Sequence, residues 1–431
     1  MMNFQGGLLR SSVIYTIANI INASIPLCLL PILTRVLSPS DYGKVAMFAT
    51  LLAIFSAFTG FNSLGALTVR YFQQDQFVLS KYVSTCLAIL FGSLVLVLGI
   101  VLLSINWFAH ITQLPAQWVV IAVIIAGAQF IFQIPLTLWR ASNQPFKYAS
   151  LQIAQSAINA ALSLWLVLGL GWAWEGSTSG QSFSLIIFAV FVLILLHLSG
   201  SARGAPRKDY ALDALKFGVP LIPHVIGTML MTMSDRVMIT KLLGLEQTGI
   251  YMVGMQIGMG LGLLTQSFNK AFGPWLFGKL SDIDEMGKVR IVRYTYLYFF
   301  IVSMLAILLG LLAPWLLAIL VGEKFRAASG IVIYIALGFA FGGMYLMVTN
   351  YIFYMSKTYI LAIITVVSGF INVVLNFFLI QLFGLKGAAL GFLISQAVFF
   401  ICTWFLANSV YPMPWKKVLL DSYTLNLRIY L

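Results

Sequence analysis

Long apolar stretches alternate with short polar connections from one end of the chain to the other. Each stretch is roughly 20 residues long, enough for a helix to cross the hydrocarbon core of a bilayer. We therefore predict an all-α polytopic membrane protein with about 12 transmembrane helices. The predicted spans are 11–36, 45–67, 83–104, 118–138, 150–170, 180–199, 214–240, 249–275, 293–314, 330–355, 360–382 and 387–408.

Composition supports this interpretation and excludes an ordinary soluble domain. Hydrophobic residues make up 61% of the 431 residues and charged residues only 9%, whereas roughly a quarter of the residues in a soluble protein are charged. The first apolar stretch follows Arg10 and is too long for the apolar region of a signal peptide. We therefore expect this stretch to be retained as the first spanning helix.

The distribution of basic residues predicts the orientation of the chain in the membrane. Most of the 25 Lys and Arg residues fall in connections on the same side as the N-terminus. Cytoplasmic connections carry such an excess, so we expect both termini to be cytoplasmic. The net charge of +13 then reflects membrane topology and does not indicate nucleic acid as a partner. The outer connections carry Arg35, Lys44, Lys241, Lys324, Arg326 and Lys386.

The two halves of the sequence resemble each other. The segment ILTRVLSPSDYG at 32–43 aligns with MITKLLGLEQTG at 238–249, and INAALS from Ile158 aligns with INVVLN from Ile371. The spacing between matching segments is nearly constant, which indicates a duplication; the alternative is chance similarity among apolar helices. The alignment pairs Thr34 with Thr240, Arg35 with Lys241, Gly43 with Gly249, and Asn159 with Asn372.

The duplication predicts two lobes of six helices in the same orientation. We expect a pseudo-two-fold axis along the membrane normal, and parallel repeats of this kind commonly surround a central cavity used for alternating access. A basic connection that contains Gly and Pro separates the halves near the midpoint. The predicted domains are an N-terminal lobe 1–200, a cytoplasmic linker 201–213, a C-terminal lobe 214–408 and a cytoplasmic tail 409–431.

Three charged residues fall inside predicted spans: Asp235, Arg236 and Lys270. A charge there costs about 2.5–3.5 kcal/mol on insertion scales, so it usually faces a partner or a wet cavity. Neighbouring side chains on a helix point about 100° apart, so we expect Asp235 to pair with Lys270 and Arg236 to face a cavity or an anionic ligand. The alternative is an internal salt bridge with Arg236 reaching to the interface. Asp235 is also a candidate structural or coupling carboxylate.

Four further basic residues are candidates for binding an anionic substrate. Arg70 and Arg140 end spans two and four on the predicted cytoplasmic side. The planar fork of arginine suits a phosphate, although both residues are equally placed to anchor the helices at the interface. Arg35 and Lys241 occupy equivalent outer ends of spans one and seven, where they are positioned to receive a departing anion or to cap the helices.

The sequence does not have the features of an enzyme. It contains no HExxH motif, no Gly-rich phosphate loop and no clustered His and Cys residues, so we predict no catalytic residue, no metal site and no cofactor. The short outer connections leave no room for a catalytic domain. Several spans carry Asn residues that can hydrogen-bond either sugar hydroxyls or neighbouring helices, namely Asn19, Asn22, Asn159 and Asn372.

Several segments resemble the polysaccharide exporters of the multidrug/oligosaccharidyl-lipid/polysaccharide (MOP) superfamily, and most closely its Wzx-type O-antigen flippases. The resemblance covers nearly the whole chain, with the turn LSPSDYG at 37–43 and the pair Asp235-Arg236 as its most specific parts. The other segments that carry it are SSVIYTIANI, TVRYF, RASNQPFKYA and MSDRVMITKLLGLEQTGIY.

The resemblance implies a fold and a substrate. The expected fold is MATE-like, with twelve helices in two lobes that form a V-shaped, cation-lined cavity. The expected substrate is an undecaprenyl-diphosphate-linked oligosaccharide, moved from the cytoplasmic to the periplasmic leaflet of a bacterial inner membrane. A polysaccharide polymerase and a chain-length regulator are possible protein partners. On this interpretation Arg70 and Arg140 recruit the diphosphate, and Arg236 with Lys270 contacts it midway.

Two other functions remain as alternatives. A cation-coupled exporter of drugs or small molecules in the same superfamily needs acidic residues for its ion and its substrate, and only Asp235 lies within a predicted span. An integral-membrane polymerase or transferase needs catalytic residues that the sequence does not offer. The sugars carried, and whether H+ or Na+ drives transport, are not specified by the sequence.

Overall fold

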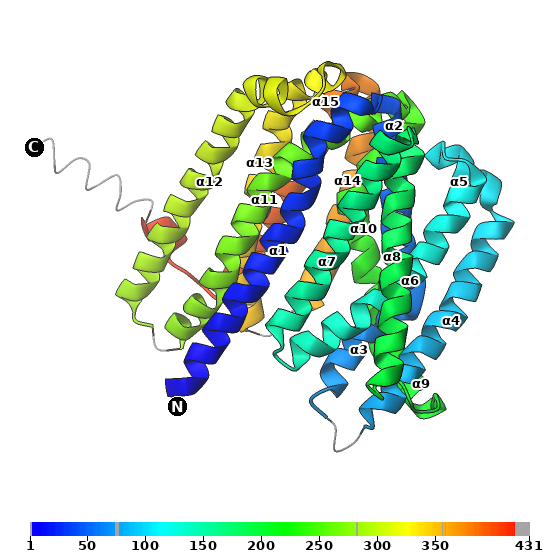
Figure 1. Cartoon of the computed structure of the whole chain (residues 1–431). Coiled ribbons are helices and arrows are strands. Elements are labelled where there is room, and N and C mark those ends of the chain that lie inside the picture. The colour runs from blue at the N-terminus through cyan, green and yellow to red at the C-terminus, as the bar shows by residue number, and fades with distance from the viewer. Residues whose placement is uncertain (1, 74–76, 282, 356, 358, 419–431) are drawn as a thin grey trace, which may run out of the picture. The chain divides into compact units, whose positions relative to one another are not determined.

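The computed structural model describes residues 2–73, 77–281, 283–355, 357 and 359–418, and within them the secondary structure is helical with no strand (Figure 1). The α-helices are α1 (Met2–Val36), α2 (Pro39–Phe58), α3 (Ser63–Arg70), α4 (Leu79–Leu103), α5 (Ile105–Thr112), α6 (Ala116–Ala141), α7 (Pro145–Leu164), α8 (Ala173–Leu198), α9 (Lys208–Gly218), α10 (Ile222–Leu243), α11 (Leu245–Leu280), α12 (Glu285–Leu320), α13 (Ser329–Tyr354), α14 (Tyr359–Phe383) and α15 (Leu385–Val410).

Twelve helical segments in the described residues are long and apolar enough to cross a membrane. This number confirms the predicted fold class, and the chain is a multi-pass membrane protein. Ten spans are each formed by one long α-helix, in two cases extended at one end by a short 3₁₀ or π-helical turn. The other two, Pro39–Arg70 and Lys208–Leu243, each join two α-helices through a short 3₁₀ turn.

The breaks in these two spans have local causes. Between α2 and α3, Gly60 adopts φ 72°, and a Cβ there would fall 2.0 Å from the ring of Phe130. Only glycine fits this backbone and this contact. Between α9 and α10 the turn Val219–Leu221 contains Pro220, which lacks the N–H that a continuous helix needs. As a result α3 and α9 become short, separately oriented helices, and they pack against each other.

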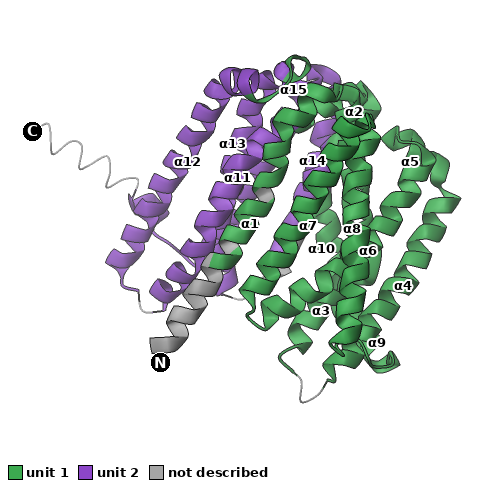
Figure 2. Ribbon diagram, in the orientation of Figure 1, with its two compact units in different colours: residues 1–229, 236–252, 320–325 green, residues 230–235, 253–319, 326–431 purple. Residues whose placement is uncertain are grey.

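By their contacts the residues divide into two compact units (Figure 2). Unit 1 comprises residues 1–229, 236–252 and 320–325, and unit 2 comprises residues 230–235, 253–319 and 326–431. Each unit has its own core. The predicted lobe boundaries stay a prediction, as does the cytoplasmic location of the linker and the tail. Helix α9 begins inside the predicted linker and belongs to unit 1, and residues 419–431 of the predicted tail lie outside the described residues.

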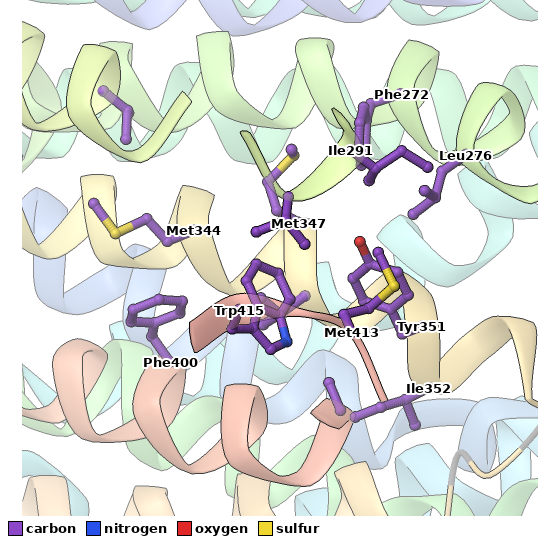
Figure 3. Packing of buried hydrophobic residues seen from close by; sticks show 14 of the residues in the cluster. Phe272, Leu276, Ile291, Met344, Met347, Tyr351, Ile352, Phe400, Met413 and Trp415 are labelled. Carbon is purple, nitrogen blue, oxygen red and sulfur yellow. The ribbon is translucent and has the colours of Figure 1, made fainter. Parts of the chain in front are cut away.

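Unit 2 packs around a cluster of aromatic and sulfur-containing side chains (Figure 3). Tyr351 and Trp415 lie at its centre with ring centroids 6.3 Å apart, and Phe400 and Met413 are buried beside them. Large flat rings fill space while methionine fills irregular gaps. Unit 1 has two such clusters, one of which is centred on α2 and α6 and includes Phe48 and Trp118 in an edge-to-face contact at 5.8 Å.

Unit 1 also contains a pair of contacts that repeat between the two halves of the sequence. The backbone N–H of Gly322 donates to Thr34 Oγ1 at 3.2 Å. Gln113 Nε2 donates to the carbonyl oxygen of Thr240 at 2.8 Å. The alignment pairs Thr34 with Thr240. In each half, the threonine at this position accepts a hydrogen bond from a connection in the other half.

Candidate functional site

A cavity of about 320 Å³ lies inside unit 1, between helices α1, α2, α6, α7 and α8. Seven of the twelve described residues that line it carry a carboxamide, and none of the twelve is ionisable. We call this cavity the carboxamide pocket. Its carboxamides are Asn22, Gln129, Gln133, Gln152, Gln155, Asn159 and Gln181.

Helical spacing brings these side chains to the pocket. Gln129 and Gln133 are four residues apart on α6 and share a face, as do Gln152, Gln155 and Asn159 on α7. Helices α7 and α8 approach closely at Gly180, which has no side chain. A Cβ there would fall 2.5 Å from the backbone nitrogen of Ser163. Figure 1 shows α1 and α7 running side by side, and the two helices are in contact.

Serine hydroxyls hold three of the carboxamides in place. Ser56 Oγ donates to Gln129 Oε1 at 3.2 Å, and Ser163 Oγ donates to Asn159 Oδ1 at 3.2 Å. The hydroxyl of Ser156 donates to Asn22 Oδ1. A carboxamide offers two donors and an acceptor with two lone pairs, so one bond to serine fixes the side chain and leaves hydrogen-bonding capacity for a ligand.

Three carboxamides of the pocket have no hydrogen-bond partner among the described residues: Gln133, Gln152 and Gln181. The Oε1 atom of Gln152 is itself buried. Buried polar atoms are nearly always hydrogen-bonded, so an unmatched group of this kind calls for a partner such as water or a ligand. The pocket therefore presents donors and acceptors that the protein leaves unpaired.

The remaining wall of the pocket is apolar. Phe132 is 4% exposed and packs edge-to-face on Phe188 at 6.0 Å, while Leu52 and Leu185 contribute aliphatic surface. Ligand sites commonly combine a largely apolar wall with a few converging polar groups. Here carboxamides predominate, which suits a ligand rich in hydroxyl groups that also has apolar C–H faces. A sugar ring has this chemistry.

Arg140, in the last turn of α6, contacts Tyr148, which lies one helical turn beyond the pocket along α7. Arg140 Nη2 donates to the hydroxyl of Tyr148 at 3.1 Å, and the guanidinium lies 5.2 Å from the centre of the Tyr148 ring. The Tyr148 hydroxyl also donates to Asn19 Oδ1 at 3.5 Å. Tyr148 and Gln152 are four residues apart, or about 6 Å along a helix. Arg140 is exposed and makes no ion pair within the part of the chain that the structure describes.

Arg70 occupies a different environment. Its Nε and Nη2 donate to the two carboxylate oxygens of Asp213 at 2.9 and 2.7 Å, and it also donates to Gln73 through Nη1. The hydroxyl of Tyr82 donates to the same carboxylate at 2.8 Å. The guanidinium fork that we expected to receive a phosphate is thus directed at α9. This bidentate pair fastens α9 to α3.

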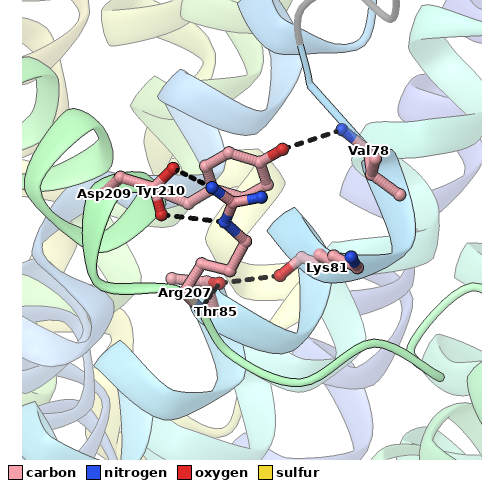
Figure 4. A network of polar contacts seen from close by, with 6 residues as sticks. All are labelled: Val78, Lys81, Thr85, Arg207, Asp209 and Tyr210. Carbon is pink, nitrogen blue, oxygen red and sulfur yellow. Dashed lines mark hydrogen bonds and ion pairs between the residues drawn. The ribbon is translucent and has the colours of Figure 1, made fainter.

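A second polar network attaches the start of α9 to α4 (Figure 4). Arg207 donates to Asp209 at 2.9 and 2.7 Å, and its backbone N–H donates to Thr85 Oγ1 at 3.0 Å. Val78 N–H donates to the hydroxyl of Tyr210 at 3.1 Å. The Asp209 carboxylate raises the pKa of Arg207 above its ordinary value through their hydrogen bond. The predicted linker is thus partly an ordered helix held on unit 1.

The other predicted site residues are distributed over both units. Asp235 is 1% exposed whereas Lys270 is exposed, and their pairing stays a prediction. Arg236 is half-buried on α10. Arg35 and Lys241 lie in the last turns of α1 and α10, where their charge complements the helix dipole. Their roles toward a substrate stay predictions.

Sequence reasoning identified Asn22 and Asn159 as possible sugar contacts but missed the five glutamines of the pocket. A signal was available on α7, where Gln152, Gln155 and Asn159 recur on one face of the helix. The sequence gives no indication that this face meets Gln129 and Gln133. Their proximity depends on how α6 and α7 pack.

Comparison with known proteins gives two kinds of similarity. A family model described as polysaccharide biosynthesis protein matches residues 8–278. Two proteins of Haemophilus influenzae match over most of their length: an uncharacterized membrane protein, 27% identical over 84% of this chain and 88% of its own, and the Lsg locus putative protein 1, 22% identical over 84% and 89%.

Solved structures of similar fold include two transport proteins. The lipid II flippase MurJ in an inward closed conformation has a TM-score of 0.70 at 14% identity, over 100% of this chain and 92% of that one. An inward-facing multidrug resistance MATE family transporter of the MOP superfamily has a TM-score of 0.66 at 14% identity, over 92% and 94%. At these identities the similarity establishes the fold, which is the MOP-type fold predicted from the sequence.

Proposed function

The chain belongs to the polysaccharide biosynthesis protein family, and we propose that it is a flippase that carries a lipid-linked oligosaccharide across the membrane. The family match and the fold confirm the predicted MOP type, and both support a transporter over an enzyme. The substrate we propose is an undecaprenyl diphosphate bearing an O-antigen repeat or a similar surface polysaccharide unit. It would pass from the cytoplasmic to the periplasmic leaflet of the bacterial inner membrane.

The carboxamide pocket is the observation that supports this proposal. Unassisted flipping is slow because the head group must leave water and enter hydrocarbon, where each polar group without a hydrogen bond costs several kcal/mol. The pocket offers the unpaired carboxamides of Gln133, Gln152 and Gln181 in place of water. The lipid tail can meanwhile remain in the bilayer.

Arg140 is our candidate for the diphosphate end of the substrate. Its guanidinium is exposed and is held by Tyr148 at the end of the polar face of α7. Charge-assisted hydrogen bonds between arginine and phosphate are short and strong. A substrate with its diphosphate at Arg140 can extend its sugars along α7 toward Gln152 and Asn159.

The other basic residues have secondary roles in the proposed function. Arg236 and Lys270 would meet the diphosphate during passage, and Arg35 and Lys241 would meet it on the far side. Asp235 would serve as a structural or coupling carboxylate. Arg70 is better supported as the partner of Asp213 than as a phosphate ligand. Both termini would be cytoplasmic, and a polymerase with its chain-length regulator would act on the product.

Export of a small cationic drug is the main competing function within this fold. Cation binding requires a carboxylate or an aromatic cage. The described residues that line the carboxamide pocket include no carboxylate. The chemistry of this pocket therefore favours a glycan.

The proposal can be tested in inner-membrane vesicles with and without the protein. An impermeant lectin or glycosidase reports which leaflet carries the undecaprenyl-diphosphate oligosaccharide. Confinement of the glycan to the cytoplasmic leaflet only when the protein is missing would support the proposal. If the glycan is distributed between the leaflets in the same way without the protein, the proposed function is refuted and small-molecule export becomes the favoured function.

A further inference from the structure

We infer that the carboxamide pocket selects an uncharged sugar ring and rejects a sugar that carries a carboxylate. This inference rests on the proposed function and specifies its substrate class: neutral hexoses and N-acetylhexosamines, as opposed to hexuronic acids.

The first support is the charge of the lining. The twelve described residues around the pocket supply amides, aliphatic groups and one aromatic ring, and none supplies a cation. A carboxylate that leaves water needs a cation or several strong donors to compensate for its lost hydration. Arg140 is the cation at the end of the polar face, and in the proposed function it is occupied by the diphosphate.

The second support is the balance of donors and acceptors. Each of Gln133, Gln152 and Gln181 offers one C=O and one NH₂ group with no partner among the described residues. A sugar hydroxyl both donates and accepts, so neighbouring hydroxyls can satisfy both ends of a carboxamide. A carboxylate only accepts. In place of the hydroxymethyl group of a hexose, it would leave an amide oxygen that faces it without a donor.

The third support is size. A volume of about 320 Å³ corresponds to about ten water molecules at their share of liquid volume. This space is large enough for a sugar ring with its substituents. A ring bound there lies among the carboxamides and against Phe132 on the apolar wall, so the charge of that ring affects how well it binds.

Proteoliposomes containing the purified protein provide the test. Three substrates would be compared: undecaprenyl diphosphate carrying a neutral disaccharide, the same lipid with a hexuronic acid in place of one hexose, and the methyl ester of that hexuronic acid. We expect the acidic substrate to move at least tenfold more slowly than the neutral one. The ester has the same framework without the charge and should recover most of the neutral rate.

The outcomes separate this inference from the proposed function. Equal rates for the acidic and neutral substrates would overturn the inference and leave the flippase function standing. A slow acidic substrate with an equally slow ester would overturn it as well, because size would then be the cause. If none of the three substrates moves faster than in protein-free liposomes, the proposed function fails and the inference falls with it.

A charge introduced into the pocket gives an independent check. Gln181→Lys should raise the rate for the acidic substrate relative to the neutral one at least tenfold, since it supplies the missing cation. Gln117→Lys is the matched control because Gln117 is exposed at the start of α6 and does not line the pocket. An unchanged ratio in a Gln181→Lys protein that still moves the neutral substrate, or the same shift in the control, would contradict the inference.

Discussion

Gly43 of α2 and Gly249 of α11 face each other at a close crossing of their helices within unit 1. A Cβ on Gly43 would fall 2.1 Å from the carbonyl oxygen of Leu245, and one on Gly249 would fall 1.9 Å from that of Pro39. The sequence alignment pairs these two glycines, so the repeated motif meets its own copy. The duplication thus explains why both copies end in glycine.

This crossing predicts a strong dependence on glycine. Gly249→Ala should destabilise the protein by about 1–3 kcal/mol, because the added methyl group overlaps backbone atoms that cannot move aside independently. Gly260→Ala on the same helix is the control, since a Cβ there meets nothing within 4 Å. Thermal unfolding in detergent measures both. Equal midpoints for Gly249→Ala and the wild type would show that the helices do not cross this closely.

The ion pair between Arg70 and Asp213 should hold α9 on α3. Asp213→Ala removes a carboxylate that accepts from Arg70 and from Tyr82, and hydrogen bonds to charged groups contribute about 1.5–3 kcal/mol each. We expect faster amide hydrogen exchange in α9 in this variant. In a double-mutant cycle, Arg70→Ala and Asp213→Ala should be clearly non-additive. Additive effects would contradict the pairing.

The aligned residues Asn159 and Asn372 should respond differently to the same change. Asn372 is 1% exposed, donates to Ser395 Oγ at 3.0 Å and accepts from Ser234 and Asn376. Asn372→Ala therefore leaves buried partners unpaired and should destabilise the protein by about 1–3 kcal/mol. Asn159→Ala should spare the unfolding midpoint and slow transport, because Asn159 lines the carboxamide pocket. The reverse pattern would exclude the pocket as the site.

Arg140 should be needed for substrate binding. Arg140→Ala should weaken binding of the diphosphate lipid at least tenfold, as expected from the loss of a charge-assisted hydrogen bond of about 1.5–3 kcal/mol. Arg140→Lys should recover only part of it because lysine lacks the planar fork. Lys147→Ala, at an exposed position of the adjacent turn, is the control. Binding of the radiolabelled lipid to purified protein measures all three, and an unaffected Arg140→Ala protein would remove this residue from the site.

The sequence predicted the twelve spans well because the length and apolarity of each are local properties. It also located the repeat that brings Gly43 to Gly249. The role of Arg70 was harder to predict, since its carboxylate partner is 143 positions away in the chain. The carboxamide pocket was missed for the same reason: its residues come from five helices, and only the face formed by Gln152, Gln155 and Asn159 is visible in one segment.

In the function that we propose, the carboxamides of the pocket bind the glycan during transport. Replacing Gln133, Gln152 and Gln181 together with Leu preserves approximate side-chain size while removing three hydrogen-bonding groups, each contributing about 0.5–1.5 kcal/mol. The rate of flipping of a neutral glycolipid in proteoliposomes should fall at least tenfold, with the unfolding midpoint maintained. The exposed Gln117→Leu variant should match the wild type. A triple variant that folds and flips at the wild-type rate would contradict the account.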